Sequence, residues 1–229
     1  MDRMQKLRAT PLVEGLANSR SECDVDADLR ALTDLAIEYG ANKAIAIKAE
    51  QVVVDERVTM KCKLPPCEWY GHNLMCPPHS PAATEFREYL KRYHHGILFQ
   101  VEGVATDDLK SLVQVKDEWY CRLFRNNDFI QARRDTFTPL WFRLHGVSMK
   151  LEREAVKRGY YLSLGLVAGE CRLCETCDTS LPCKRPYEAR PSMEACGIDV
   201  VRTAKNVDWR ISFPADADKV LWTGLVLVV

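Results

Sequence analysis

The apolar positions between residues 26 and 39 repeat with the spacing of an amphipathic helix. Five of them fall on one helical face: Leu29, Leu32, Leu35, Ala36 and Tyr39. Asp26 or Asp28 is a suitable N-cap, and Gly40 stands where glycine commonly ends a helix. The pattern therefore predicts a helix over residues 26–39.

Short runs of β-branched and other apolar residues predict strands. Two such runs, residues 44–48 and 52–55, are close together, which indicates a hairpin or two neighbouring strands. The same reasoning gives strands at 97–101, 161–167 and 220–229, helices at 84–94 and at 107–157 with a break near Pro139, and a short helix that opens at Pro191.

Strands and helices alternate irregularly along the chain, which favours a single-domain α+β sandwich around a mixed sheet. Residues 1–24 show little periodicity, so we expect an irregular N-terminal segment and one domain over residues 25–229. Residues 61–82 are rich in proline, and no regular structure is expected in them.

Charge and hydropathy exclude several classes of function. The formal net charge of the 229-residue chain is zero, so no basic surface is expected to attract nucleic acid. No apolar run approaches the roughly 20 residues that span a bilayer, and none follows the N-terminal charges as in a secretory signal. We therefore expect a cytoplasmic protein. In that compartment thiols stay reduced, and clustered cysteines are typical of metal sites.

The strongest chemical signal is a group of four cysteines within thirteen residues: Cys171, Cys174, Cys177 and Cys183. The first three have the C-x2-C-x2-C spacing typical of loops that bind a 4Fe–4S cluster. Zinc is the alternative, although structural zinc sites usually join two C-x2-C pairs across a longer gap. The gap before Cys183 is longer than in the ferredoxin pattern, so Cys183 either completes this group or ligates a neighbouring cluster.

Four basic residues flank this group: Arg172, Lys184, Arg185 and Arg190. An iron–sulfur cluster with its thiolates is net negative, so nearby cations would stabilise it and raise its reduction potential. The alternative is that they are ordinary solvated surface charges.

Three more cysteines lie upstream: Cys62, Cys67 and Cys76. In chain order these three are the first group, and the four at 171–183 are the second group. The spacing of the first group matches no standard zinc finger, but three cysteines in a proline-stiffened loop favour a metal-ligand role. His72 and His79 lie in the same loop and are possible additional ligands.

Seven of the ten cysteines therefore fall into two groups, whereas two 4Fe–4S clusters need eight ligands. The eighth is Cys121, Cys196, His72 or His79, or one iron is left open to substrate; alternatively, the groups share one cluster. Isolated cysteines such as Cys23, Cys121 and Cys196 are usually small buried hydrophobes, which is the simpler interpretation of these three. We expect the two cysteine loops to lie close together.

Two stretches, residues 67–81 and 171–200, resemble a family of predicted cysteine-rich metal-binding proteins, a domain of unknown function. The resemblance runs from about Lys43 to the end of the sequence. It implies metal binding, with an iron–sulfur centre, at the seven grouped cysteines. It implies no particular reaction.

Three functions follow from these patterns. The first is a 4Fe–4S protein that transfers electrons or gives redox support to a partner enzyme; this needs no catalytic side chains, and the sequence has no phosphate loop, dinucleotide fingerprint or hydrolase elbow. The second is an enzyme, of the dehydratase or desulfurase class, that uses the open iron of a three-cysteine 4Fe–4S cluster as a Lewis acid on a small-molecule substrate. The third is a zinc-stabilised interaction module. Whether the protein is an enzyme is left open by the sequence.

Overall fold

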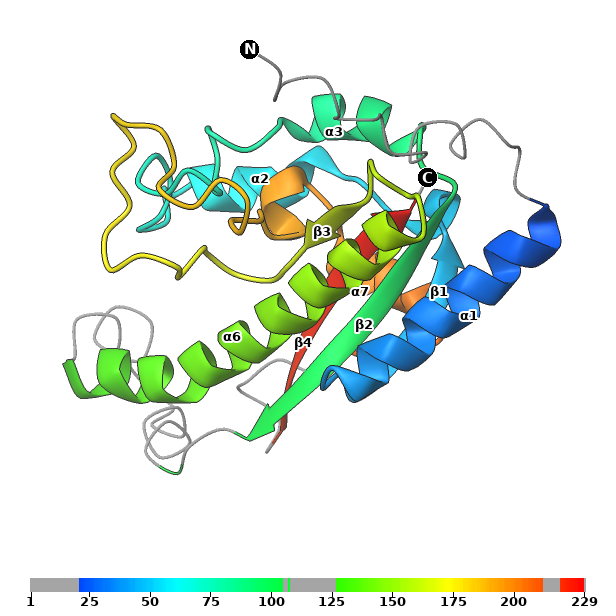
Figure 1. The fold of residues 1–229 in the computed structure, drawn as a ribbon. Helices are drawn as coiled ribbons and strands as arrows, with labels where there is room; N and C mark the ends of the chain where they lie inside the picture. Colours follow the sequence, from blue (N-terminus) through cyan, green and yellow to red (C-terminus); the bar gives the residue numbers. More distant parts are fainter. Residues whose placement is uncertain (1–20, 105–106, 108–126, 212–218, 229) are drawn as a thin grey trace, which may run out of the picture.

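The computed structural model describes residues 21–104, 107, 127–211 and 219–228 (Figure 1). The regular elements, with η for short 3-10 helices, are α1 (Glu22–Glu38), β1 (Lys43–Lys48), η2 (Ala49–Gln51), α2 (Glu56–Lys63), α3 (Ala83–Leu90), β2 (His95–Val104), α6 (Asn127–Lys157), β3 (Leu164–Leu166), η3 (Glu194–Cys196), α7 (Val200–Lys205) and β4 (Lys219–Val228).

The four strands form one sheet in the order β1-β2-β4-β3. Every strand pairing in it is antiparallel, with β2 and β4 paired along their whole length from His95–Val228 to Val104–Lys219. The α+β prediction is thus confirmed, but the expected mixed sheet is wrong. The parallel pairing that the structure describes is an isolated bridge between Val167 and Ser192.

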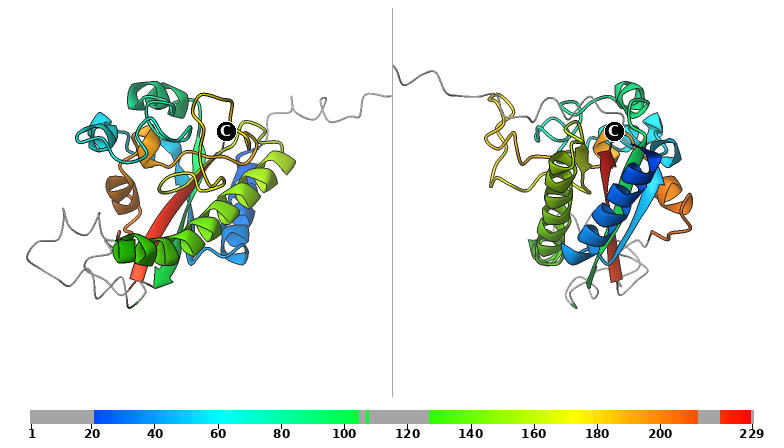
Figure 2. Two further views of the ribbon diagram at one scale, coloured as in Figure 1. Left: turned by 90° about the vertical axis from the view of Figure 1, so that its left-hand side faces the viewer. Right: turned by 45° about the vertical axis from the view of Figure 1, so that its right-hand side comes forward.

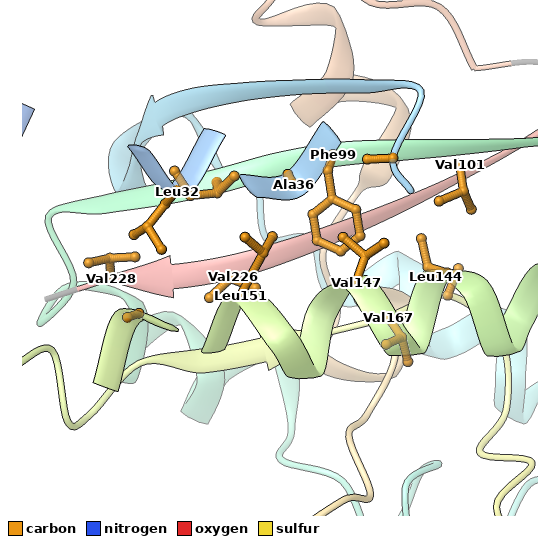
Figure 3. Packing of buried hydrophobic residues seen from close by; sticks show 14 of the residues in the cluster. Leu32, Ala36, Phe99, Val101, Leu144, Val147, Leu151, Val167, Val226 and Val228 are labelled. Carbon is orange, nitrogen blue, oxygen red and sulfur yellow. The ribbon is translucent and has the colours of Figure 1, made fainter. Parts of the chain in front are cut away.

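The sheet is covered on both faces, so the α+β chain forms a sandwich (Figures 1 and 2). Helices α1 and α6 pack on one face, where Leu32 and Leu144 meet Phe99 of β2 and Val226 of β4 (Figure 3). On the other face, α3 and η3 pack against side chains of alternate strand positions, which include Leu98, Leu225 and Leu227. Because successive strand residues point to opposite faces, burial on both sides produces nearly continuous apolar strands.

Helix α1 confirms the predicted amphipathic pattern but begins earlier than expected. Ser21 rather than Asp26 or Asp28 is its N-cap, because the Ser21 hydroxyl accepts a hydrogen bond from the Asp24 N–H at 3.2 Å. Residues 22–24, expected to be irregular, are therefore helical; residues 1–20 lie outside the described part of the chain. Gly40 ends the helix with a φ of +111°, which only glycine adopts readily.

The predicted strand at residues 52–55 is wrong. Its backbone groups bond to the segment between η3 and α7: the Asp55 N–H donates to Gly197 O, and the Asp199 N–H donates to Val53 O, each at 2.8 Å. Only Val54 makes a bridge, with Ile198. These distant partners, and not β1, fix the course of the segment.

Three further predictions need correction. Cys62 lies on α2, so the 61–82 segment is not wholly irregular. Helix α6 continues through Pro139, because Leu140 and Leu144 are buried in the core against the sheet, although Figure 1 shows a bend in its N-terminal half. The helix expected at Pro191 begins only at Glu194 and is a 3-10 turn. Residues 108–126, part of the predicted helix 107–157, are outside the described residues.

Gly224 of β4 stands directly opposite Phe99 of β2. A Cβ atom at position 224 would lie 2.4 Å from Cζ of the Phe99 ring. The absence of a side chain at Gly224 thus lets a large aromatic ring cross the strand and fill the core. In the ranges described above, no helix is both long enough and apolar enough to cross a membrane.

Candidate metal centre

The four cysteines of the 171–183 group surround one cavity. The loop that carries them leaves β3 through Gly169, and Cys171, Cys174, Cys177 and Cys183 all line the cavity. Each of the four is partly buried. The structure therefore brings together the side chains that the spacing singled out; that they bind a metal remains a prediction.

Backbone N–H groups point at the sulfur atoms of this group. The N–H of Leu74 donates to Sγ of Cys177, and the N–H of Arg185 donates to Sγ of Cys183, both at 3.4 Å. Burial raises the pKa of the Cys171 thiol, and a hydrogen bond from the backbone of Leu173 partly offsets this rise. Such N–H···S bonds favour the thiolate, which is the form that binds metal.

Burial acts in the opposite direction. It is the main reason that the pKa of Cys171 is raised, and the neighbouring Cys174, Cys183 and Cys177 add to the effect. Several thiolates in one partly buried cavity repel one another unless a cation lies among them. Loss of the thiol protons is therefore favourable only together with metal binding.

The three cysteines of the first group also converge. Cys62 comes from the last turn of α2, and the Cys67 N–H donates to Cys62 O at 2.9 Å, which closes the chain into a tight turn. Burial, then the charge of Cys67 and a hydrogen bond between the two thiols, raises the pKa of Cys62. Cys76 is buried, and burial together with Cys67, Glu170, Cys62 and Cys171 raises its pKa to about 12.

The two groups lie side by side, as expected. Figures 1 and 2 show the loop that follows α2 (cyan to green) next to the loop that follows β3 (yellow). Asn73 joins them, because its Nδ2 donates to Cys171 O at 3.0 Å while its Oδ1 accepts from the Met75 N–H at 3.0 Å. The charge of Cys171 also acts on the pKa of Cys76 in the other group.

The cations near the second group divide into two kinds. Lys184 and Arg185 line the cavity. Arg172 instead pairs with Glu170 at 2.6 Å, and Arg190 pairs with Glu152. Arg185 also pairs with Glu188 at 3.1 Å. Lys184 is thus placed to offset negative charge in the cavity, whereas the three arginines each pair with a glutamate of the surrounding chain.

A single metal ion and a cluster require different spacings of the sulfur atoms. A tetrahedral zinc site with bonds of about 2.3 Å brings its sulfur atoms to within about 4 Å of one another. Within the described part of the chain, no three His, Cys, Asp or Glu side chains meet closely enough to hold one metal ion. Thiolates that bind separate irons of a cluster need only surround a shared cavity, as these four do.

Comparison with known proteins agrees with the chemistry of these loops. A family model described as "Predicted metal-binding protein (DUF2284)" matches residues 45–228. The chain belongs to this family. No curated protein and no solved structure matches the chain. The residues that match the family model include most of the sheet and both cysteine loops, and metal binding is the property that the match supports.

The remaining cysteines and the two loop histidines differ in their surroundings. Cys196 is buried in the core against α3 and the sheet, and burial raises its pKa to about 12. Cys23 is exposed on α1. His72 and His79 are exposed, and the His79 ring contacts Gly71 O of its own loop at 3.4 Å. Cys121 lies outside the described residues.

One residue of the site was not found from the sequence. Glu194 lies at the start of η3 and lines, with Cys62 and Cys67, an open cavity of about 510 Å³. Its surroundings in the chain, Met193, Ala195 and Cys196, are all buried. The signal in the sequence was a glutamate inside an otherwise apolar run, since charged side chains are rarely buried unless they are paired.

Proposed function

We propose that the protein is an iron–sulfur protein that holds a 4Fe–4S cluster on Cys171, Cys174, Cys177 and Cys183 and transfers electrons to or from a partner protein. The observation that carries the proposal is the common cavity lined by these four thiols, with backbone N–H groups directed at two of their sulfur atoms. Soft thiolate ligands of this number suit iron–sulfur clusters. When bound, such a cluster supplies one-electron redox chemistry.

We further propose that Cys62, Cys67 and Cys76 hold a second metal group beside the first. The contacts of Asn73 and Leu74 with the other loop support two adjacent centres. Adjacent centres suit passage of an electron from an exposed site to a more buried one. Cys67 is exposed and Cys76 is buried, so the first group reaches from the surface towards the interior. Because thiol-rich metal sites persist where thiols stay reduced, we propose a cytoplasmic location.

The test is anaerobic purification with iron, sulfide and zinc measured per chain, followed by visible absorption and electron paramagnetic resonance (EPR) of the reduced protein. We expect about four irons and four sulfides for one cluster, or about eight of each for two. The Cys174→Ser variant should lose one cluster, whereas Cys23→Ser, which changes an exposed cysteine on α1, should keep the full content. Zinc without sulfide would contradict the proposal and favour the zinc-stabilised module.

A catalytic role is the second candidate, and the cavity beside Cys62 and Cys67 favours it. Its volume of about 510 Å³ is in the range of small-molecule sites, and Trp222 and Val58 give it apolar walls. If one iron of the first group lacks a protein ligand, exogenous cyanide or thiolate should shift one of two EPR signals. Insensitivity of both signals would mean that every iron has a protein ligand and would favour electron transfer.

A further inference from the structure

Glu194 presents a buried oxygen that no described residue satisfies. Oε2 of its carboxylate is buried and has no hydrogen-bond partner, although part of the residue reaches the surface. The Ser192 side chain and the backbone N–H of Glu194 itself bond to the carboxylate and favour its charged form, but burial outweighs them and raises its pKa. An ionised carboxylate in such a place is unfavourable unless a cation is bound to it.

Glu170 shows what a compensated carboxylate in the same region looks like. It acts on the pKa of Cys76 and is largely buried, and it pairs with Arg172 at 2.6 Å. Glu194 acts in the same way on the pKa of Cys62. Among the described residues, however, no Lys or Arg pairs with it, and this includes Lys61, which lines the same cavity.

The surrounding backbone holds Glu194 in a fixed position relative to the first cysteine group. The Ser80 hydroxyl, four residues after Cys76, donates to Ala195 O at 2.9 Å. The Asp55 N–H, at the start of α2, donates to Gly197 O at 2.8 Å. Turn η3 is therefore attached both to the loop of Cys76 and to the helix of Cys62.

We propose that Glu194 is the fourth protein ligand of the metal group at Cys62, Cys67 and Cys76, which it binds through Oε2. This inference rests on the proposed second metal group. A carboxylate oxygen is a competent ligand for zinc and for iron. The carboxyl group releases its proton when it binds, and the metal charge then compensates the buried carboxylate. Glu194 lines the same cavity as Cys62 and Cys67, whereas Cys196 is enclosed in the core.

The experiment compares Glu194→Gln with Asp199→Asn. Glutamine keeps the size of the side chain and removes its charge. Asp199 lines the same cavity and caps α7 by accepting from the Arg202 N–H at 2.9 Å, a role that asparagine also performs. In Glu194→Gln we expect one iron of the Cys62 group to lose its protein ligand, so the EPR signal of that group should change and become sensitive to exogenous cyanide, with the EPR signal of the Cys171 group unchanged. Asp199→Asn should retain the wild-type content and spectrum.

A second variant covers the case in which Glu194→Gln fails to fold. Glu194→Cys replaces the carboxylate by a thiolate, so it should retain the metal and shift the EPR spectrum of one centre. An unshifted spectrum in Glu194→Cys, or a Glu194→Gln protein that matches Asp199→Asn in both metal content and spectrum, would overturn the ligand assignment.

The design separates this inference from the proposed function. Absence of iron and sulfide from the wild type would overturn the iron–sulfur proposal and this inference with it. A full complement of iron and sulfide in the wild type, with no effect of Glu194→Gln on either centre, would overturn this inference alone.

Discussion

The backbone N–H of Leu74, in the loop of Cys67 and Cys76, donates a hydrogen bond to Sγ of Cys177 in the other cysteine loop. A donor from one group thus stabilises a thiolate of the other. Together with the adjacent hydrogen bond from Asn73 to Cys171 O, this contact makes the two loops one structural unit. A change in one loop should therefore alter the metal held by the other.

Replacement of Asn73 tests this coupling. Asn73→Ala removes a buried side chain that makes hydrogen bonds to Cys171 O and to the Met75 N–H, so we expect a loss of about 1–3 kcal/mol in the free energy of unfolding. It should also lower the metal content of both groups. The control is Asn206→Ala, which removes an exposed bond to Gln51 O and should leave the metal content unchanged. Normal metal content in Asn73→Ala would show that the loops bind metal independently.

Replacement of Cys67 tests the first group directly. Cys67→Ser should lower iron and sulfide per chain, because serine is a poorer ligand for iron than a thiolate. Cys196→Ala is the matched control, since Cys196 is buried in the core and should cost about 1 kcal/mol of stability with no loss of metal. Unchanged iron and sulfide in Cys67→Ser would remove this loop from the metal site.

The contact of Gly224 with Phe99 gives a test of the core. Gly224→Ala places a Cβ against a ring that is wholly buried, so we expect a destabilisation of about 1–3 kcal/mol in urea unfolding. Gly146→Ala, in α6, meets nothing within 4 Å and should stabilise the protein by about 1 kcal/mol. Equal effects of the two changes would mean that Phe99 moves aside easily.

His145 gives the fold a dependence on pH. Burial lowers its pKa, while the hydrogen bond between Nε2 and Glu188 O at 2.8 Å partly opposes this. The unfolded chain therefore takes up a proton near pH 6.5, before the folded protein does. The free energy of unfolding should fall as the pH decreases below about 6.5, until the folded imidazole is also protonated.

The measurement is urea unfolding at about pH 7 and about pH 5.5 for the wild type and for His145→Phe. Phenylalanine keeps an aromatic ring against Trp141, which stacks on His145 with ring centroids 4.7 Å apart. The loss of stability between the two pH values should be smaller in the variant. A loss of the same size would assign the pH dependence to other groups.

The sequence predicted those helices and strands whose apolar side chains recur at the spacing of a helix or follow one another along a buried strand. The apolar spacing of α1 and the continuous apolar runs of β2 and β4 identify elements packed on a core, and these are where the sequence placed them. Residues 52–55 have the same strand-like composition, but their backbone partners are Gly197 and Asp199. A partner so distant in sequence leaves no local signal.

The candidate metal centre shows the same contrast between residues that are close in the sequence and residues that are far apart in it. Spacing within each loop could group the cysteines, because those that lie close in space are also close in sequence; that they bind metal stays a prediction. Glu194 was missed because its importance depends on Cys62 and Cys67, which lie on a different element far along the chain. The antiparallel pairing of β3 with β4 was also beyond a local pattern, since the second cysteine loop, η3 and α7 separate them.

The position of β4 in the sheet has a consequence for biogenesis. Within the described residues β3 pairs with β4 alone, and β4 also pairs with β2 along its whole length. The ribosome releases residues 219–228 only after both cysteine loops, so the seven grouped thiols emerge before the sheet that supports them can close. Pairing over so long a stretch of chain is slow compared with local folding. The loops that carry these thiols should therefore reach their final geometry only after β4 has paired with β2 and β3.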